Sequence, residues 1–386
     1  MSKVRLTQIC NITTGKLDSN AAEENGIYPY FTCAPEPLRI NSFAFDDDVI
    51  LLAGNNAAGN FHCQRFTGKF NAYQRTYVIT AKEGYDIDYI YYNLLINLKY
   101  LKKISQGSQT KFLTMIILDA FEISNIPLEN QKRLSSVLSN IDSKIENNNK
   151  INAELESLAK TIYDYWFLQF EFPNEEGKPF KSSGGKMVWN EKLNRMIPDG
   201  WKNGNLYDIA EFTNGLACQK HRPIKNDQRL PVIKIREMHN GFTSETEWVR
   251  DDIPQKYVID DGDILFSWSA TLETIIWTGG QGALNQHIFK VSEKNCAKYY
   301  VFMQLAEYVK NFVAMAEARK TTMGHITSDH LNQSRIALPC AKVIDSFEQK
   351  VTPLFTTIIK NKQESIELSK LRDFLLPLLM NGQVRF

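Results

Sequence analysis

The two halves of this 386-residue chain repeat one another in order, and this duplication restricts the possible folds more than any other feature. The motif Leu6-x-x-Ile9-x-x-x-Thr13-x-Gly15 recurs as Leu206-x-x-Ile209-x-x-x-Thr213-x-Gly215. Later matches keep the order with small drifts in register: Tyr28-Pro29-Tyr30-Phe31 with Leu230-Pro231-Val232-Ile233, Asp46–Ile50 with Asp261–Leu265, and Ala72-Tyr73-Gln74 with Ala283-Leu284-Asn285-Gln286. Domains usually hold about 100–200 residues, so the repeat predicts two related globular units.

Each half changes from strand-like to helical character at a proline. Up to Pro127 and up to Pro339, short apolar runs alternate with Gly, Asn and Pro, which predicts a mixed α/β unit in each half. The clearest predicted strands are Val49–Leu52, Tyr77–Thr80, Val232–Ile235 and Ile264–Phe266. Beyond each proline the apolar residues recur by fours and threes, which predicts a helix of roughly 35–40 residues with a coiled-coil seam. An ordinary amphipathic core helix is the alternative.

A polar stretch separates the halves. Phe172–Pro179 and Ser182–Lys186 are rich in Pro, Gly and Ser, which is typical of a linker. The expected organisation is a first globular unit at 1–127, a long helix at 128–172, a linker at 173–198, a second unit at 199–339 and a long C-terminal helix at 340–386. This is an α+β fold of two pseudo-symmetric mixed α/β domains and two long helices.

The composition is that of a soluble globular protein, with 43% apolar and 23% charged residues. The start of the chain has no signal-peptide pattern, and no apolar run approaches the roughly 20 residues of a membrane span, so we expect a cytoplasmic protein that does not contact a membrane. The six cysteines form no Cys-x-x-Cys pair and are expected to be buried thiols. The formal charge of +1 excludes a strongly basic, DNA-coating protein.

Two local clusters of cations could nevertheless bind phosphate. Residues 216–236 include Lys220, Arg222, Lys225, Arg229, Lys234 and Arg236 against the single acid Asp227. Residues 99–111 include Lys99, Lys102, Lys103 and Lys111 and no acid. A solvated protein face is the alternative for each cluster.

The sequence motifs of common catalytic sites are missing. Gly184-Gly185-Lys186 lacks the earlier glycine and the hydroxyl residue of a phosphate-binding loop, and no Gly-x-Gly-x-x-Gly follows a predicted strand. The six histidines form no metal-ligand pair at helical spacing, and Glu176-x-Lys178 stands in the linker without a second acid. We therefore expect no catalytic site, no metal site and no cofactor bound by this chain.

Several ordered segments carry a family resemblance that covers essentially the whole chain. They are Ile197-Pro198-Asp199-Gly200-Trp201, Gly262–Ser267, Ala283–His287, and the linker from Gly177 to Met187. Together they resemble the specificity subunits of Type I restriction-modification systems. The resemblance implies two target-recognition domains, each reading half of a split double-stranded DNA target, and two helices that pack as an antiparallel coiled coil and bind two modification subunits. It further implies that restriction subunits join the complex, and that S-adenosylmethionine, ATP and Mg belong to the partner subunits.

The resemblance also assigns candidate DNA-binding positions. Asn and Gln can pair with adenine, and Arg and Lys with guanine, in the major groove. In the first unit the candidates are Gln64, Arg65, Tyr73, Gln74, Arg75, Ser108, Gln109, Thr110 and Lys111. In the second unit they are Lys234, Arg236, Ser267, Trp268, Asn285, Gln286, His287, Arg319, Lys320, Thr321 and Thr322, and the basic cluster adds Lys220 and Arg222 as candidates. Structural loop residues or buried capping residues are the alternative for each position.

The repeat also suggests a helix register. Asn148 and Asn361 are equivalent in the repeat and lie near the midpoints of the two expected helices. An antiparallel pairing would place them opposite each other on the seam, where a polar pair fixes register. The alternative is that both amides face water. The first copy departs from the second by lacking an Ile-Pro-x-Gly-Trp entry and by having Ala53-Gly54 where the second has Ser267-Trp268, so the two half-sites are expected to differ.

Two other classes of protein stay open from the sequence. One is a self-sufficient DNA methyltransferase or nuclease whose motifs have degenerated, and the other is a coiled-coil adaptor that does not bind DNA. Catalysis by the purified chain would establish the first, and the charge and shape of the globular loops would identify the second.

Overall fold

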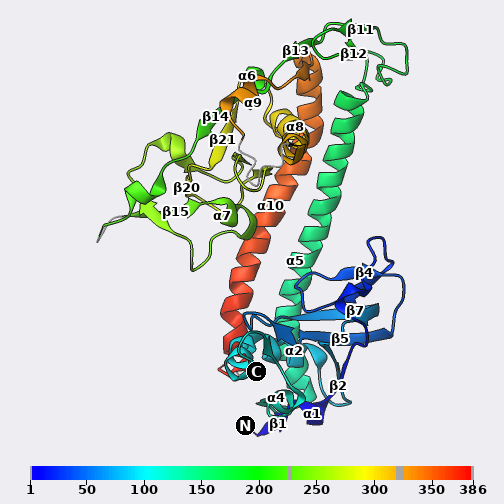
Figure 1. Cartoon of the computed structure of the whole chain (residues 1–386), viewed down its shortest axis with the longest axis vertical. Coiled ribbons are helices and arrows are strands. Elements are labelled where there is room, and N and C mark those ends of the chain that lie inside the picture. Colours follow the sequence, from blue (N-terminus) through cyan, green and yellow to red (C-terminus); the bar gives the residue numbers. More distant parts are fainter. Residues whose placement is uncertain (1, 225–227, 319–325, 384–386) are drawn as a thin grey trace. The chain divides into compact units, whose positions relative to one another are not determined.

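The computed structural model describes residues 2–224, 228–318 and 326–383. The chain divides into two compact units, the first formed by Met1–Ile145 with Glu367–Phe386 and the second by Glu146–Ile366. Each unit combines a β-rich globular part with portions of two long helices (Figure 1). The unit boundaries therefore pass through both helices, whereas the sequence placed its boundaries at the helix ends.

The first unit is built on one six-stranded sheet of order β2-β8-β5-β7-β3-β4. All neighbours are antiparallel except β3 and β7, which are parallel. The strands are β2 (Cys10–Thr14), β3 (Tyr28–Phe31), β4 (Leu38–Ile40), β5 (Phe45–Ala53), β7 (Cys63–Ala72) and β8 (Thr76–Ala81). The predicted strands Val49–Leu52 and Tyr77–Thr80 lie inside β5 and β8.

Both faces of the central strand β5 are buried, because its apolar residues run without alternation. Ile50 and Leu52 pack in a core with α2 (Ile87–Ile96), whereas Val49 and Leu51 pack with Phe31 and Phe70 on the other face. The smaller elements of this unit are β1 (Lys3–Arg5), α1 (Leu6–Ile9), η1 (Ser19–Ala21), β6 (Asn55–Asn56), α3 (Leu98–Ile104), β9 (Lys111–Phe112), α4 (Met115–Asp119) and β10 (Glu122–Ser124).

The second unit has two four-stranded sheets, β14-β21-β18-β19 and β16-β15-β20-β17, in place of the single sheet of the first unit. The parallel pair β15–β20 repeats the parallel pair β3–β7 of the first unit. The strands are β14 (Ala210–Asn214), β15 (Arg229–Ile233), β16 (Trp248–Arg250), β17 (Val258–Ile259), β18 (Ile264–Ser267), β19 (Glu273–Ile276), β20 (Gly282–Leu284) and β21 (Ile288–Glu293). The long β7 of the first unit therefore corresponds to β19 and β20, and the pseudo-symmetry expected from the repeat is present.

The other elements of the second unit surround these sheets. They are β11 (Met187–Asn190), β12 (Arg195–Pro198), β13 (Lys202–Gly204), α6 (Leu206–Ile209), η3 (Cys218–His221), α7 (Ile235–Asn240), η4 (Gln255–Tyr257), α8 (Lys298–Ala318), α9 (Ser328–Asn332) and β22 (Ile336–Leu338). The strand expected at Val232–Ile235 ends at Ile233, because Ile235 already begins α7.

Two long helices, α5 (Leu128–Tyr163) and α10 (Ala341–Met380), contribute to both units. In the second unit Asn148 contacts Glu364 and Asn152 contacts Ile358, so one helix descends in number as the other ascends and the pair is antiparallel. In the first unit Asp142 binds Arg372. The first helix is shorter than the expected 128–172: a π-helical turn, Asp164–Leu168, follows it, and Phe170 then turns the chain with a φ of 64°.

The expected linker at 173–198 is folded, which corrects the prediction. β11 and β12 form an antiparallel hairpin within it. Phe172 is buried and stacks on Phe180 at 4.6 Å and on Trp201 at 5.4 Å. The polar composition of this segment wrongly indicated a linker, because a few large aromatic residues are enough to anchor a segment that is otherwise polar.

Candidate nucleic-acid interface

In the first unit, three segments meet just beyond the end of β5. The backbone N–H of Gly54 donates to the carbonyl of Arg75 at 2.8 Å, and the Gly54 carbonyl accepts from the N–H of Leu113 at 2.8 Å. These bonds enclose a cavity of about 280 Å³ that is lined by Thr14, Gly54, Gln74, Arg75, Tyr77 and Leu113. We call Thr14, Gly54, Gln74 and Arg75 the first turn surface.

Two predicted DNA-binding side chains lie exposed on the first turn surface. Gln74 is exposed, and its amide donates to Asp18 at 2.7 Å while its oxygen is left to accept. Arg75 is exposed, and its guanidinium forms no salt bridge with any residue that the structure describes. Tyr73 precedes them, is half-buried, and forms an isolated β-bridge with Leu17. A free guanidinium next to an amide is a suitable donor set for base edges or phosphates.

Lysines extend this surface. Lys111 lies on β9, which pairs with β6 so that Lys111 is opposite Asn56, two residues after Gly54. Lys102, in the last turn of α3, donates to Asn60 at 2.7 Å. Ser108, Gln109 and Thr110 form the exposed loop before Lys111. The cluster is suited to phosphate contacts, because those require cations but no specific geometry of base edges.

Gln64 and Arg65 do not join this surface. Arg65 binds Asp88 at 2.6 Å and Asp48 at 2.9 Å and donates to the carbonyl of Val49, and its side chain is only 21% exposed. Gln64 is half-buried, and its amide donates to the backbone of Pro35. Both residues hold β7 to its neighbours, so the structure gives them a packing role rather than an exposed donor.

The second unit repeats the turn surface with different side chains. The N–H of Trp268 donates to the carbonyl of His287 at 3.4 Å, and its carbonyl accepts from the N–H of Ile326 at 3.1 Å. The Trp268 indole donates to Asn214 at 3.2 Å and packs against His287, with ring centroids 5.6 Å apart. Gln286 is half-buried and His287 is exposed. We call Asn214, Trp268, Gln286 and His287 the second turn surface.

Two neighbouring candidates are structural. Ser267 is fully buried, and its hydroxyl donates to the carbonyl of Thr271 at 2.6 Å, which closes the turn between β18 and β19. Asn285 is 8% exposed, its N–H donates to the carbonyl of Ile233, and its side-chain oxygen accepts from the N–H of His287. This is the buried capping role that the sequence left open as the alternative. Arg319, Lys320, Thr321 and Thr322 lie outside the described residues.

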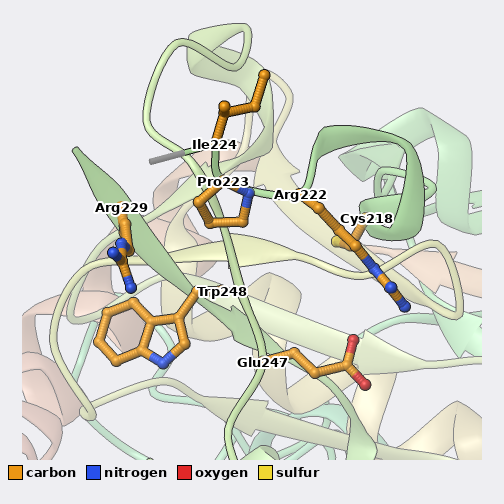
Figure 2. A pocket seen from close by; sticks show the side chains of 7 residues that line it. All are labelled: Cys218, Arg222, Pro223, Ile224, Arg229, Glu247 and Trp248. Atoms are coloured by element: carbon orange, nitrogen blue, oxygen red, sulfur yellow. The ribbon is translucent and has the colours of Figure 1, made fainter. Parts of the chain in front are cut away.

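Arg222 lines a second cavity, of about 490 Å³, beside the edge strand β16 (Figure 2), and Lys220 lies two residues before it in the chain. Both are exposed. The cavity is lined by Cys218, Arg222, Pro223, Ile224, Arg229, Glu247 and Trp248. Trp248, which is 47% exposed, was not singled out in the sequence because it lies outside the basic cluster. Arg229 lies beside the exposed indole of Trp248, whereas the Arg222 side chain lies on the side of Glu247 (Figure 2). A cation beside an exposed aromatic ring could hold a phosphate and a planar ring together.

Lys234 and Arg236 are bound to carboxylates instead. Arg236 donates to the buried carboxylate of Glu237 at 2.8 Å and to Glu245 at 3.0 Å. Lys234 forms a salt bridge with Glu247 at 2.5 Å, and this bond lowers the pKa of the Glu247 carboxyl. The sequence placed Arg236 just after a strand, projecting outward, but it lies on α7 and covers Glu237. Its donors are therefore largely occupied within the unit.

On the helix seam of the second unit, Asn148 is buried and donates to the carboxylate of Glu364 at 2.8 Å and to the backbone carbonyl of Asn361 at 3.4 Å. The side-chain amide of Asn361 pairs with Asn152, not with that of Asn148. The two predicted register residues are thus neighbours across the pair, each with a different side-chain partner.

Among the described residues, no group of three or more His, Cys, Asp or Glu side chains could hold a metal ion. No described helix is long and apolar enough to cross a bilayer. Two related units that present amide, cationic and aromatic side chains on equivalent turns are typical of a protein that reads nucleic acid at two places.

Comparison with known proteins identifies this class. The model of the Type I restriction modification DNA specificity domain matches residues 1–157 and 198–368, and the chain belongs to this family. It is 36% identical over 374 residues to the Type I restriction enzyme EcoDI specificity subunit of Escherichia coli, covering 91% of this chain and 80% of that protein. It is 27% identical over 318 residues to the MjaIX specificity subunit of Methanocaldococcus jannaschii, covering 80% and 71%.

The fold agrees with this assignment. The S subunit of a Type I restriction-modification system from M. genitalium superposes with a TM-score of 0.63 at 15% identity, covering 98% of this chain and 96% of that one. The chain is therefore a DNA-specificity subunit of a Type I restriction-modification system and is not itself an enzyme. The alternative of a self-sufficient methyltransferase or nuclease finds no support.

Proposed function

We propose that this chain reads a bipartite double-stranded DNA target, with one half-site bound by each turn surface, and that it recruits two modification subunits and the restriction subunits. The observation that carries the proposal is the repeated backbone geometry at Gly54 and Trp268. Equivalent hydrogen bonds hold equivalent turns, yet the exposed side chains on them differ. A duplicated scaffold with different side chains is what two different half-sites require.

Phosphate contacts complete the binding model. Lys102 and Lys111 flank the first turn surface, and Arg222 and Arg229 border the cavity in the second unit. Such contacts orient the protein on the duplex without reading sequence, whereas the amides, Arg75 and the indole can reach base edges. This division of roles is consistent with a near-neutral chain whose cations are concentrated locally.

The long helices supply equivalent surfaces for two identical partners. Asn148 and Asn361 lie 213 positions apart, and so do Leu158 on α5 and Leu371 on α10. Both leucines are exposed, 47% for Leu158 and 46% for Leu371. Exposed leucines at matching positions of a repeat favour one modification subunit on each helix.

We further infer that S-adenosylmethionine, ATP and Mg²⁺ bind to the partner subunits and that the complex works in the cytoplasm. The described residues contain no candidate metal group, and the sequence contains no phosphate-binding loop. The chain's part in the reaction is then to place the modification subunits over the two half-sites.

Methylation mapping tests the proposal. The chain is produced together with its modification subunit in a host without other DNA methylation, and methylated bases are mapped across the genome. A split motif that depends on the chain is expected, and replacing residues 1–127 with those of a relative should change one half of it. Methylation or cleavage by the purified chain alone, or a change in both halves after the replacement, would overturn the proposal.

A further inference from the structure

Each residue of the first turn surface has an equivalent in the second turn surface. In the first unit the cavity is lined by Thr14, Tyr77 and Leu113 besides the turn itself. In the first unit Thr14 pairs with Tyr77, and the backbone N–H of Leu113 donates to the carbonyl of Gly54. In the second unit Asn214 pairs with Phe289, and the backbone N–H of Ile326 donates to the carbonyl of Trp268. The positions that line the cavity therefore correspond to Asn214, Phe289 and Ile326 in the second unit.

Trp268 uses these same positions. Its indole bonds to Asn214 and packs against His287 and Phe289, with ring centroids 5.6 Å and 6.0 Å away. The first unit has a glycine at the equivalent position, Gly54. The indole thus occupies in the second unit the space that the cavity of about 280 Å³ leaves open in the first.

Backbone spacing fixes this difference. A Cβ atom at Gly54 would lie 2.3 Å from the carbonyl oxygen of Arg75, so no larger residue fits without a backbone shift. In the second unit the corresponding N–H to carbonyl distance is 3.4 Å rather than 2.8 Å, and this looser approach admits a side chain. Gly54 therefore keeps the space beside Arg75 open as part of the fold.

The residues that accompany this space differ in chemistry. Arg75 and His287 occupy equivalent turn positions. The carbonyl of Arg75 accepts from the N–H of Gly54, and the carbonyl of His287 accepts from the N–H of Trp268. An exposed guanidinium can form two parallel hydrogen bonds with O6 and N7 of guanine, which an imidazole cannot do. The second turn instead offers an indole face and His287, and an apolar ring is suited to the methyl group of thymine.

We propose, building on the proposed function, that Arg75 and the cavity kept open by Gly54 form a guanine-reading subsite in the first half-site. The equivalent pair, His287 and Trp268, gives the second half-site no guanine requirement at the matching position. Gly54 with Arg75 in the first unit, and Trp268 with His287 in the second, are therefore equivalent pairs that determine specificity.

The test exchanges the pairs in the full chain, produced with its modification subunit. Arg75→His should lower the preference for one G·C pair in one half-site by about 5- to 150-fold, the worth of a bidentate contact, and leave the other half-site unchanged. The double variant Trp268→Gly with His287→Arg should create a guanine preference in the opposite half-site. Arg39→His is the matched control, since Arg39 is an exposed arginine on the edge strand β4 of the same unit.

Genome-wide methylation maps and a panel of base-substituted duplexes measure these preferences. The inference is overturned if Arg75→His changes no position, changes both half-sites, or acts like Arg39→His. Thermal unfolding of each variant identifies a folding defect. Arg75→Lys, whose ammonium can still donate to guanine but lacks the planar fork of Arg, should retain more of the preference than Arg75→His. A wild-type complex without a split motif would instead refute the proposed function itself.

Discussion

The side-chain amide of Asn361 on α10 donates a hydrogen bond of 3.0 Å to the amide oxygen of Asn152 on α5. Asn152 and its neighbour Asn148 are both buried, with 4% and 1% of their surfaces exposed. Asn148 in turn donates to Glu364 at 2.8 Å. The helix seam of the second unit thus holds a short polar section, and sliding one helix along the other would leave its amides unpaired.

We expect Asn361→Ala to destabilise the chain, because the buried oxygen of Asn152 would lose its donor. The free energy of unfolding should fall by about 1–2 kcal/mol, as measured by denaturant titration. Asn149→Ala is the control: Asn149 is exposed on the same helix as Asn152, and its replacement should have almost no effect. Equal losses from both variants would show that the polar section does not contribute to stability.

Arg236→Ala should lower the melting temperature of the chain rather than relax base preference. The carboxylate of Glu237 is 1% exposed and binds Arg236, so removing the guanidinium leaves a buried charge with fewer partners. Lys220→Ala, which removes an exposed cation of the same unit, should leave the melting temperature unchanged. If Arg236→Ala keeps the wild-type melting temperature but alters the methylated motif, Arg236 reads a base.

Lys111→Ala should weaken DNA binding by the same factor on every sequence. Lys111 lies in a cluster of lysines without a nearby acid in sequence, and removing one phosphate-binding cation reduces the salt slope of binding by about 0.9. Binding of the reconstituted complex to target and non-target duplexes at several salt concentrations measures this slope. Lys69→Ala, which changes an exposed lysine of the first unit, serves as the control, and weaker binding to the target alone would assign Lys111 to base reading.

Leu158→Glu and Leu371→Glu should each remove one modification subunit. A charge on an exposed apolar contact disfavours its burial in an interface, and the two positions are equivalent in the repeat. The mass of the reconstituted complex should fall by one modification subunit for each single variant and by two for the double variant. Glu154→Lys, on an exposed position of α5, controls for a charge change. Complexes of unchanged mass would exclude these leucines from the interface.

The sequence predicted most of the fold, because the repeat and the hydrophobic runs are local signals. The strands around Val49 and Tyr77 and the two long helices follow directly from such runs. The folded segment after the first helix was missed, since its stability depends on Phe172 and Phe180 stacking, a contact that composition does not reveal. The end of that helix was likewise missed because the turn at Phe170 depends on tertiary packing.

Which candidate residues contact DNA stays a prediction, but the structure separates the exposed candidates from those whose polar groups are already bound. Arg75, Gln74 and His287 are exposed on the turns as a DNA-binding role requires. Arg65, Arg236 and Ser267 matched the same variable regions, but their polar groups bind partners within their own units. Charge and hydroxyl groups at loop positions do not reveal whether a carboxylate or carbonyl lies beside them, because those partners are distant in the sequence.

The first unit is built from both ends of the chain, and this has a consequence for its synthesis on the ribosome. Its core contains Leu376, Leu379 and Met380, and the amide of Asn93 contacts the sulfur of Met380 at 3.4 Å. The strands of this unit are translated first, yet their core is completed only after the last turns of α10 have been made. A ribosome that stops between the two halves would release a chain with an open apolar face, which chaperones and proteases can recognise.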